Sequence, residues 1–341
     1  MKQFRHHEQT PYQEHPFAEY VRILGKGKKG SRPLTQDEAY RAFTMILNDE
    51  VLPVQLGAFL MLMRVKEETP EELAGFVNAA RNSFPVVNDV TVDLDWSSYA
   101  GKRRQLPWFI LSALLLAGNG IKVFMHGASG HSAGRLYTEQ MLTFLGLKPA
   151  HSIAEASLQL QQRSFSYLSL EHFCPKLDEI IELRPILGLR SPVHTLVRLL
   201  NPFNADYSIQ GIFHPSYRAV HQHAAALLNQ PHMAVLKGEG GETERNPDMD
   251  CLVQSVHLGE LSEETWPMLF ARRHIKPEQL NPQDLANLWQ GVLNDDYAEA
   301  SVIGTAAIAL KLLGKADTQQ HAHELATEMW LSRDKQLSFG I

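Results

Sequence analysis

Apolar residues recur at intervals of three and four along the first part of the chain, and this spacing predicts helices. One helix begins after Thr35, whose hydroxyl is expected to cap an early backbone N–H while Glu38 reaches back to the cap. Thr69 and Glu72 repeat this capping box at the start of another helix. Residues 54–65 are apolar nearly all round, so we expect them to form a central, buried helix.

The pattern changes after Pro85. Short apolar and β-branched runs alternate with helical patterns, which is typical of a mainly parallel sheet covered by helices. Strands are predicted at 121–125, 208–213, 233–236 and 251–258, and helices at 135–145 and 215–228. We therefore predict a mobile arm over 1–16, a small helical domain over 17–85 with a contribution from about 183–203, and a larger α/β domain over 86–341.

Composition limits the location of the protein. The polar N-terminus has no apolar core of the kind that a secretory signal needs. The longest apolar run, residues 106–117, is shorter than the roughly 20 residues that span a bilayer. Cys174 and Cys251 are far apart and match no metal-binding spacing, which fits a reducing compartment. We expect a cytoplasmic protein that does not associate with membranes.

The charge distribution indicates a local anion site. A net charge of −6 would by itself repel phosphates. However, three windows, at 21–34, 96–138 and 183–205, contain basic residues and no acid. Such segregation is typical of an anion-binding region on an acidic protein, although solvated loops would give the same runs. The basic residues of interest in these windows are Lys26, Lys28, Lys29, Arg32, Lys102, Arg103, Arg104, Arg135, Arg184 and Arg190.

The loop from Gly25 to Gly30 reads GKGKKG and is the sharpest of these signals. Its lysines form a flexible cationic loop, and lysines contact backbone phosphates without reading sequence. The spacing differs from that of a Walker phosphate loop, and the segment precedes a helical hairpin instead of following a strand.

Residues 187–202 read LGLRSPVHTLVRLLNP, and this stretch resembles the LG-x-RT…N-x-LGPL-x-NP signature of the anthranilate phosphoribosyltransferase family. Weaker similarities follow in the same order: VFMHG at 123–127, SAG at 132–134, LG at 145–146 and FCP at 173–175. The resemblance covers about 17–330. It implies the fold shared with nucleoside phosphorylases, and commonly a homodimer formed through the helical domain.

The segment that corresponds to the family's phosphate loop differs strongly from it. Active members hold phosphoribosyl pyrophosphate on a GTGGD turn followed by an NIST helix start, where backbone N–H groups meet the diphosphate. Here residues 98–108 read SYAGKRRQLPW. Gly101 survives, and Lys102, Arg103 and Arg104 occupy the turn. Bulky cations suit a phosphate ester in a polymer, although they could also still hold phosphoribosyl pyrophosphate.

Other family positions carry altered residues as well. The family's Mg²⁺-binding acid pair corresponds to Glu242 and Thr243, with Glu244 able to serve if the loop shifts; a solvated acidic loop is the favoured interpretation. Arg184 stands where the family has an arginine facing the aromatic acceptor, and it suits a carboxylate or a phosphate equally well. His126 follows a predicted strand and is a candidate for lining the site.

Three hypotheses follow. A subgroup of the family with an altered phosphate loop binds DNA or RNA, and this chain resembles that subgroup. We therefore favour non-specific binding of single-stranded nucleic acid in a basic groove between the domains, with no cofactor. The alternative is an active phosphoribosyltransferase that uses Mg²⁺ and phosphoribosyl pyrophosphate on an unidentified aromatic or nitrogenous acceptor. A protein-interaction scaffold would bind neither ligand.

Overall fold

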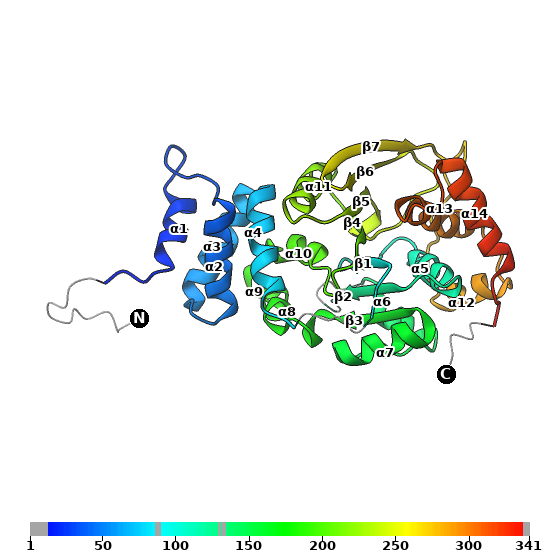
Figure 1. Ribbon diagram of the computed structural model, residues 1–341, viewed down its shortest axis with the longest axis horizontal. Coiled ribbons are helices and arrows are strands. Elements are labelled where there is room, and N and C mark those ends of the chain that lie inside the picture. Colours follow the sequence, from blue (N-terminus) through cyan, green and yellow to red (C-terminus); the bar gives the residue numbers. More distant parts are fainter. Residues whose placement is uncertain (1–12, 86–89, 129, 131–133, 337–341) are drawn as a thin grey trace.

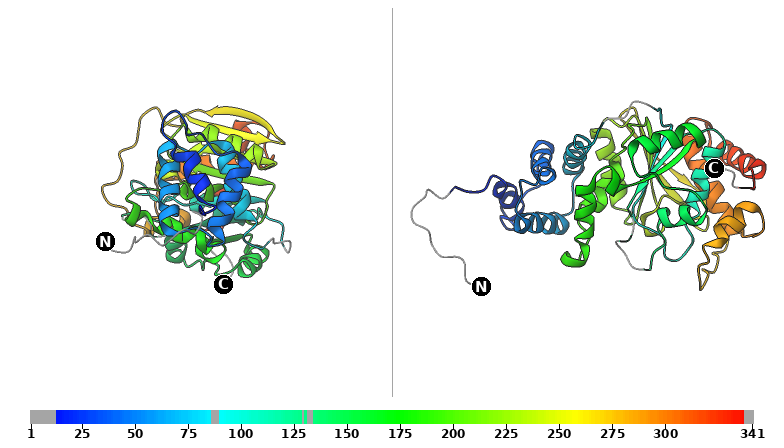
Figure 2. Two further views of the ribbon diagram at one scale, coloured as in Figure 1. Left: turned by 90° about the vertical axis from the view of Figure 1, so that its left-hand side faces the viewer. Right: turned by 90° about the horizontal axis from the view of Figure 1, so that it is seen from below.

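The computed structural model describes residues 13–85, 90–128, 130 and 134–336 (Figure 1). Most of the predicted N-terminal arm, residues 1–12, lies outside this range. A small helical domain lies at one end of the long axis and a larger α/β domain at the other, as predicted (Figures 1 and 2). No helix within the described ranges is long and apolar enough to cross a membrane.

Four helices form the helical domain: α1 (Ala18–Gly25), α2 (Gln36–Leu47), α3 (Pro53–Lys66) and α4 (Pro70–Arg81). Both predicted capping boxes are present, because the Thr35 and Thr69 N–H groups each donate to a glutamate three residues on, at 2.9 Å. Thr35 pairs with Glu38, and Thr69 pairs with Glu72. In each pair the glutamate N–H donates in return to the threonine hydroxyl.

The expectation that residues 54–65 form a buried helix is wrong. Val54 is 76% exposed and Val65 is 83% exposed. Only one side of α3 faces the domain core, where Phe59, Leu60 and Met63 are buried. α1 packs against α3, and the remaining side of α3 faces solvent.

The α/β domain contains a seven-stranded sheet in the order β3-β2-β1-β4-β5-β6-β7. The strands are β1 (Leu94–Ser98), β2 (Val123–Gly127), β3 (Phe165–Ser169), β4 (Tyr207–Ile212), β5 (His232–Lys237), β6 (Cys251–His257) and β7 (Glu260–Trp266). β1 to β5 pair in parallel, whereas β6 and β7 pair antiparallel at one edge. The four predicted strands correspond to β2, β4, β5 and β6; β1, β3 and β7 were not predicted.

Helices cover both faces of the sheet. They are α5 (Phe109–Gly118), α6 (Thr138–Phe144), α7 (Ile153–Arg163), α8 (Pro175–Glu182), α9 (Arg184–Leu187), α10 (Val193–Leu196), α11 (Tyr217–Leu227), α12 (Gln283–Gln290), α13 (Asp296–Leu312) and α14 (Gln319–Ser332), with 3₁₀ turns at Leu170–His172, Val197–Leu199 and Glu239–Gly241. Successive strand residues point to opposite faces. In β2, Met125 joins the core beneath α5, α12, α13 and α14, whereas Phe124 joins the core that continues into the helical domain.

The strand order places a switch point between β1 and β4. From β1 the sheet grows through β2 to β3 on one side, and from β4 to β5 on the other. In open α/β sheets the crevice outside the carboxyl ends of the strands at such a point is the usual ligand site. We call this border of the parallel strands the carboxyl edge; it carries the loops that follow β1, β4 and β5.

Candidate functional site

The loop after β1 forms a small anion cradle, made of the Ala100 N–H, the Gly101 N–H and the Ser98 hydroxyl. Both N–H groups donate to Glu242 Oε1 at 2.6 Å, and the hydroxyl donates to Oε2 at 2.8 Å. Gly101 has φ +66°, and a Cβ there would lie 3.1 Å from Arg135 Cβ, so the turn requires glycine. The cradle is fully buried and is filled by the chain's own carboxylate.

A second carboxylate fills the adjacent helix start. Glu244 Oε2 accepts a hydrogen bond of 2.9 Å from the Phe109 N–H at the first residue of α5, and Oε1 lies 2.5 Å from Lys102 Nζ. Glu239 Oε2 is 3.3 Å from the same ammonium group. Burial disfavours the charged lysine, but the charges of the two glutamates outweigh this and raise the pKa of Lys102.

Close backbone packing holds these carboxylates in place. A Cβ on Gly238 would lie 1.7 Å from the Glu242 carbonyl oxygen, and one on Gly211 would lie 2.3 Å from the Glu242 carbonyl carbon. No other residue type fits at either position without moving the backbone. The glycines therefore allow the 238–244 loop to pack closely enough for its glutamates to reach the loop after β1.

These contacts correct three expectations. Lys102 was predicted to meet a phosphate, but it is 1% exposed and tied to two carboxylates. Glu242 and Glu244 were predicted as weak metal ligands or as a solvated loop. Both are buried, and their oxygens accept hydrogen bonds from the protein. Within the described ranges, no group of three or more His, Cys, Asp or Glu residues is arranged to hold a metal ion.

His126 also lies inside the fold. The Tyr99 hydroxyl is 2.7 Å from its Nδ1, and Asp95 Oδ2 is 3.3 Å from its Nε2. The imidazole is 0% exposed, and its ring stacks on Phe124. This residue supports the sheet beneath the site and does not line it.

Arginines gather beside the filled cradle. Arg135 donates to the Ala100 and Gly101 carbonyl oxygens at 2.9 and 3.0 Å, and so fixes the turn from outside. Arg190 is partly exposed and makes no hydrogen bond or ion pair with any residue that the structure describes. Burial and the charges of three neighbouring arginines lower its pKa to about 10. These neighbours are Arg135, Arg184 and Arg198.

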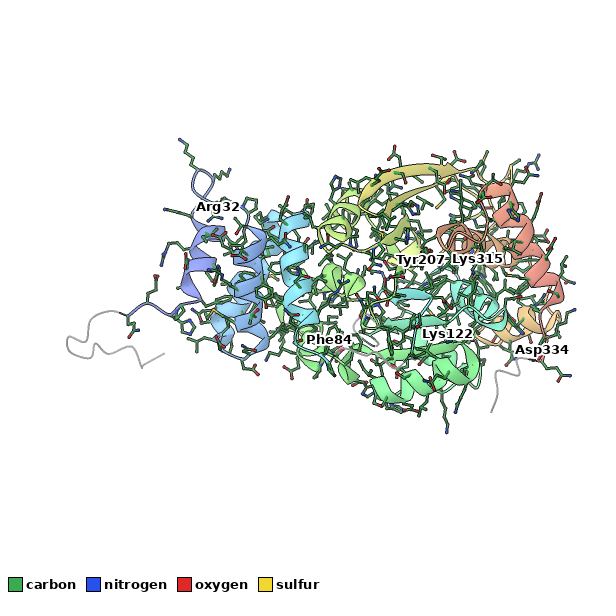
Figure 3. The ribbon with its side chains drawn as sticks, viewed as in Figure 1. Arg32, Phe84, Lys122, Tyr207, Lys315 and Asp334 are labelled. Carbon is green, nitrogen blue, oxygen red and sulfur yellow. The ribbon has the colours of Figure 1, made fainter. Side chains whose placement is uncertain are left out.

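The remaining predicted cations lie in two places. Arg103 and Arg104 are exposed at the carboxyl edge. Lys26, Lys28 and Lys29 are exposed on the loop after α1, at the end of the helical domain remote from the α/β domain (Figure 1). Arg32, labelled in Figure 3, lies beside that loop and binds Glu38 through two hydrogen bonds of 2.7 Å. This bond lowers the pKa of Glu38 to about 2. Within one chain, these cations and those at the carboxyl edge do not form one groove.

An open cleft of about 100 Å³ lies where the two domains meet at the carboxyl edge. We call it the arginine cleft and define it by Arg64, Arg190, Arg198, Phe213, His214 and Tyr217. Arg64 comes from α3 of the helical domain, and Phe213 directly follows β4. Arg64, Phe213, His214 and Tyr217 were not predicted, because no local motif marks them. The one sequence signal near the cleft is that Phe213 ends the predicted strand 208–213 and that His214 and Tyr217 come directly after it.

His221 contributes to the cleft floor and predicts a pH dependence of stability. It is 1% exposed, and its Nδ1 lies 2.8 Å from Gln210 Oε1. Burial, followed by the charge of Arg198, lowers its pKa from 6.5 to about 3. Since the unfolded chain binds the proton more tightly, stability is complete above pH 6.5 and falls as the pH drops toward 3. Urea unfolding should show a free energy of unfolding about 2 kcal/mol lower at pH 5 than at pH 7. In His221→Gln this difference should disappear. An equal loss in the variant would contradict this assignment.

Comparison with known proteins identifies the class of this fold and site. Residues 18–84 match the helical bundle domain of a glycosyl transferase family, and residues 110–332 match its a/b domain. The chain belongs to this family, glycosyl transferase family 3.

Individual relatives and solved structures agree with this assignment. The chain is 29% identical to the uncharacterized protein YbiB of Escherichia coli over 208 residues, which are 59% of this chain and 64% of YbiB. It is 27% identical to anthranilate phosphoribosyltransferase from Bacillus cereus over 316 residues, 90% of this chain and 91% of that protein. Its fold is similar to anthranilate phosphoribosyltransferase from Thermus thermophilus, with a TM-score of 0.79, 20% identity, and coverage of 96% and 97%. It is also similar to the Saccharomyces cerevisiae enzyme in complex with PRPP and Mg, with a TM-score of 0.77, 17% identity and 96% coverage of each chain.

Proposed function

We propose that this chain binds single-stranded nucleic acid without base specificity at its carboxyl edge, and that it does not bind phosphoribosyl pyrophosphate. The observation that carries the proposal is the filled cradle. Glu242 and Glu244 accept hydrogen bonds from the N–H groups of Ala100, Gly101 and Phe109. A diphosphate in the same place would have to expel two buried carboxylates or accept their repulsion, which is costly at low dielectric.

The cations that remain accessible support a polymer as the ligand. Arg103 and Arg104 are exposed, and Arg190 is partly exposed at the entrance of the arginine cleft. Arg103 and Arg104 lie on the loop after β1, whereas Arg190 lines the cleft beside the end of β4, so the cations come from two separate segments. Such an arrangement suits successive phosphates of a strand, and a single strand can bend to follow it.

Charge reversal tests this proposal. The variant Arg103→Glu/Arg104→Glu should weaken binding of a fluorescent single-stranded oligonucleotide at least about tenfold at low salt, and it should flatten the salt dependence. A matched control is Lys122→Glu/Lys315→Glu, which makes the same change in charge. Lys122 precedes β2 at the opposite border of the sheet, and Lys315 is exposed (Figure 3). Equal losses in both variants would indicate only a net-charge effect and would contradict a site at the carboxyl edge.

Calorimetry tests the competing transferase function. Titration with phosphoribosyl pyrophosphate and Mg²⁺ should give no binding heat, because the chain's own acids fill the cradle. A saturable binding heat that the nucleic acid abolishes would overturn the proposal. It would favour the alternative, an active phosphoribosyltransferase.

We also propose a homodimer formed through the helical domain. Val54, Ala58 and Val65 are exposed on one side of α3, where they form an apolar stripe. Light scattering should give twice the mass of one chain, and Val54→Glu/Val65→Glu should reduce it to that of a monomer. A monomeric mass for the unaltered protein would contradict this proposal.

A further inference from the structure

We propose that the arginine cleft is a nucleotide subsite, in which Arg190 and Arg64 hold one phosphate while Phe213 stacks on the attached base. This inference rests on the proposed function and adds to it a location and a recognition chemistry. It assigns a role to Phe213 and Arg64, which belong to neither the cradle nor the predicted basic loops.

The charge of the cleft favours an anion. Three arginines line it, and no carboxylate does among the described residues. Arg198 has a structural role, since it donates to the Gly211 and Gly241 carbonyl oxygens at 2.9 and 2.8 Å. Arg190 has no such bonds with described residues, so its guanidinium donors remain available. A guanidinium without a partner in a half-buried place is well suited to a phosphate.

The size of the cleft sets which part of the ligand enters. A volume of about 100 Å³ is well below the roughly 300–1,000 Å³ of pockets that enclose a whole small-molecule ligand, so the cleft suits the phosphate group of a nucleotide. The base must therefore lie at the entrance of the cleft and not within it.

An aromatic surface stands at that entrance. Phe213 is 51% exposed although it is a large apolar side chain, and its ring packs edge-on against His214 with 4.8 Å between centroids. Tyr217 forms the neighbouring wall, and its hydroxyl is fixed by a 3.0 Å hydrogen bond to Glu68. Exposed aromatic rings beside cations are what non-specific single-strand binders use, because every base has a face that stacks.

The nucleotide is expected to be part of a strand. Gly240 also borders the cleft, and a Cβ on it would lie 2.6 Å from the Gly101 carbonyl oxygen, so the cleft lies next to the loop that carries Arg103 and Arg104. A strand with one phosphate in the cleft would continue along those exposed arginines. A free mononucleotide would use the cleft alone.

The experiment compares three probes on the full-length protein: a single-stranded oligothymidylate, an abasic strand of equal length, and thymidine monophosphate as competitor. Phe213→Ala should weaken binding of oligothymidylate about tenfold and leave binding of the abasic strand within about twofold. Phe213→Tyr should bind as the unaltered protein does. Arg190→Gln should weaken both strands about tenfold.

Matched controls are Phe144→Ala, an aromatic side chain that is 49% exposed at the end of α6, and Lys315→Gln. Both should bind as the unaltered protein does. Unchanged binding of oligothymidylate by Phe213→Ala and Arg190→Gln would overturn the subsite but leave the proposed function standing. Failure of the unaltered protein to bind either strand would overturn the proposed function itself. Displacement of the strand by thymidine monophosphate at equal phosphate concentration would overturn the assignment to a polymer.

Discussion

Replacing Glu242 with alanine is expected to lower the free energy of unfolding by about 3 kcal/mol or more and to make stability depend on added phosphate. The carboxylate is fully buried and accepts from Ala100, Gly101 and Ser98. Its removal leaves two backbone N–H groups without partners and the Ser98 hydroxyl with Thr138 as its remaining partner, in a space that fits an oxygen anion. Millimolar inorganic phosphate or diphosphate should therefore stabilise Glu242→Ala and leave the unaltered protein unchanged.

Thermal unfolding with and without phosphate measures this directly. The control is Glu278→Ala, which removes an exposed carboxylate from the segment before α12 and should neither destabilise the protein nor create a response to phosphate. An equal response to phosphate in the unaltered protein and in Glu242→Ala would mean that the cradle is open to ligands. That result would contradict the structural role of Glu242.

Replacing Lys102 with methionine is expected to cost about 3–5 kcal/mol of stability, because it leaves the Glu244 carboxylate buried without its counter-ion. Adding Glu244→Gln removes that charge and keeps an oxygen for the Phe109 N–H, so the double variant should be more stable than Lys102→Met alone. Urea unfolding of the unaltered protein, Lys102→Met, Glu244→Gln and the double variant gives the coupling free energy between the two side chains.

The sign of the pH dependence provides an independent check on the same pair. Without Lys102, burial raises the pKa of Glu244 further, and the folded state then binds a proton that the unfolded state releases. The stability deficit of Lys102→Met relative to the unaltered protein should therefore shrink as the pH falls from 8 to 5. A constant deficit across that range would mean that Glu244 carries no unpaired charge in the variant.

The fold was predictable where local chemistry determined the structure. The capping boxes at Thr35 and Thr69 formed as their spacing predicts, and the strands with continuous apolar runs were located. β1 and β3 were missed because their sequences, LDWSS and FSYLS, carry serines that nevertheless lie in a sheet buried on both faces. β7 was missed because an edge strand with five of its first six residues polar or acidic on an exposed surface resembles a loop.

The site was less predictable because its decisive contacts join distant residues. Lys102 and Glu244 are 142 positions apart, and nothing in either local sequence indicates that each neutralises the other. A run of three basic residues was treated as one surface. The fold turns Lys102 inward, where its backbone pairs with Leu136 in an isolated bridge, and leaves Arg103 and Arg104 exposed.

The carboxylates of the 238–244 loop also change how the stability of this chain relates to the contents of the cell. A protein that takes up a free anion gains stability in proportion to the logarithm of that anion's concentration, and it loosens when the supply falls. Here the anion is part of the polypeptide, at a fixed and permanent effective concentration. The turn after β1 and the start of α5 are therefore ordered in every folded molecule, independently of the level of any metabolite.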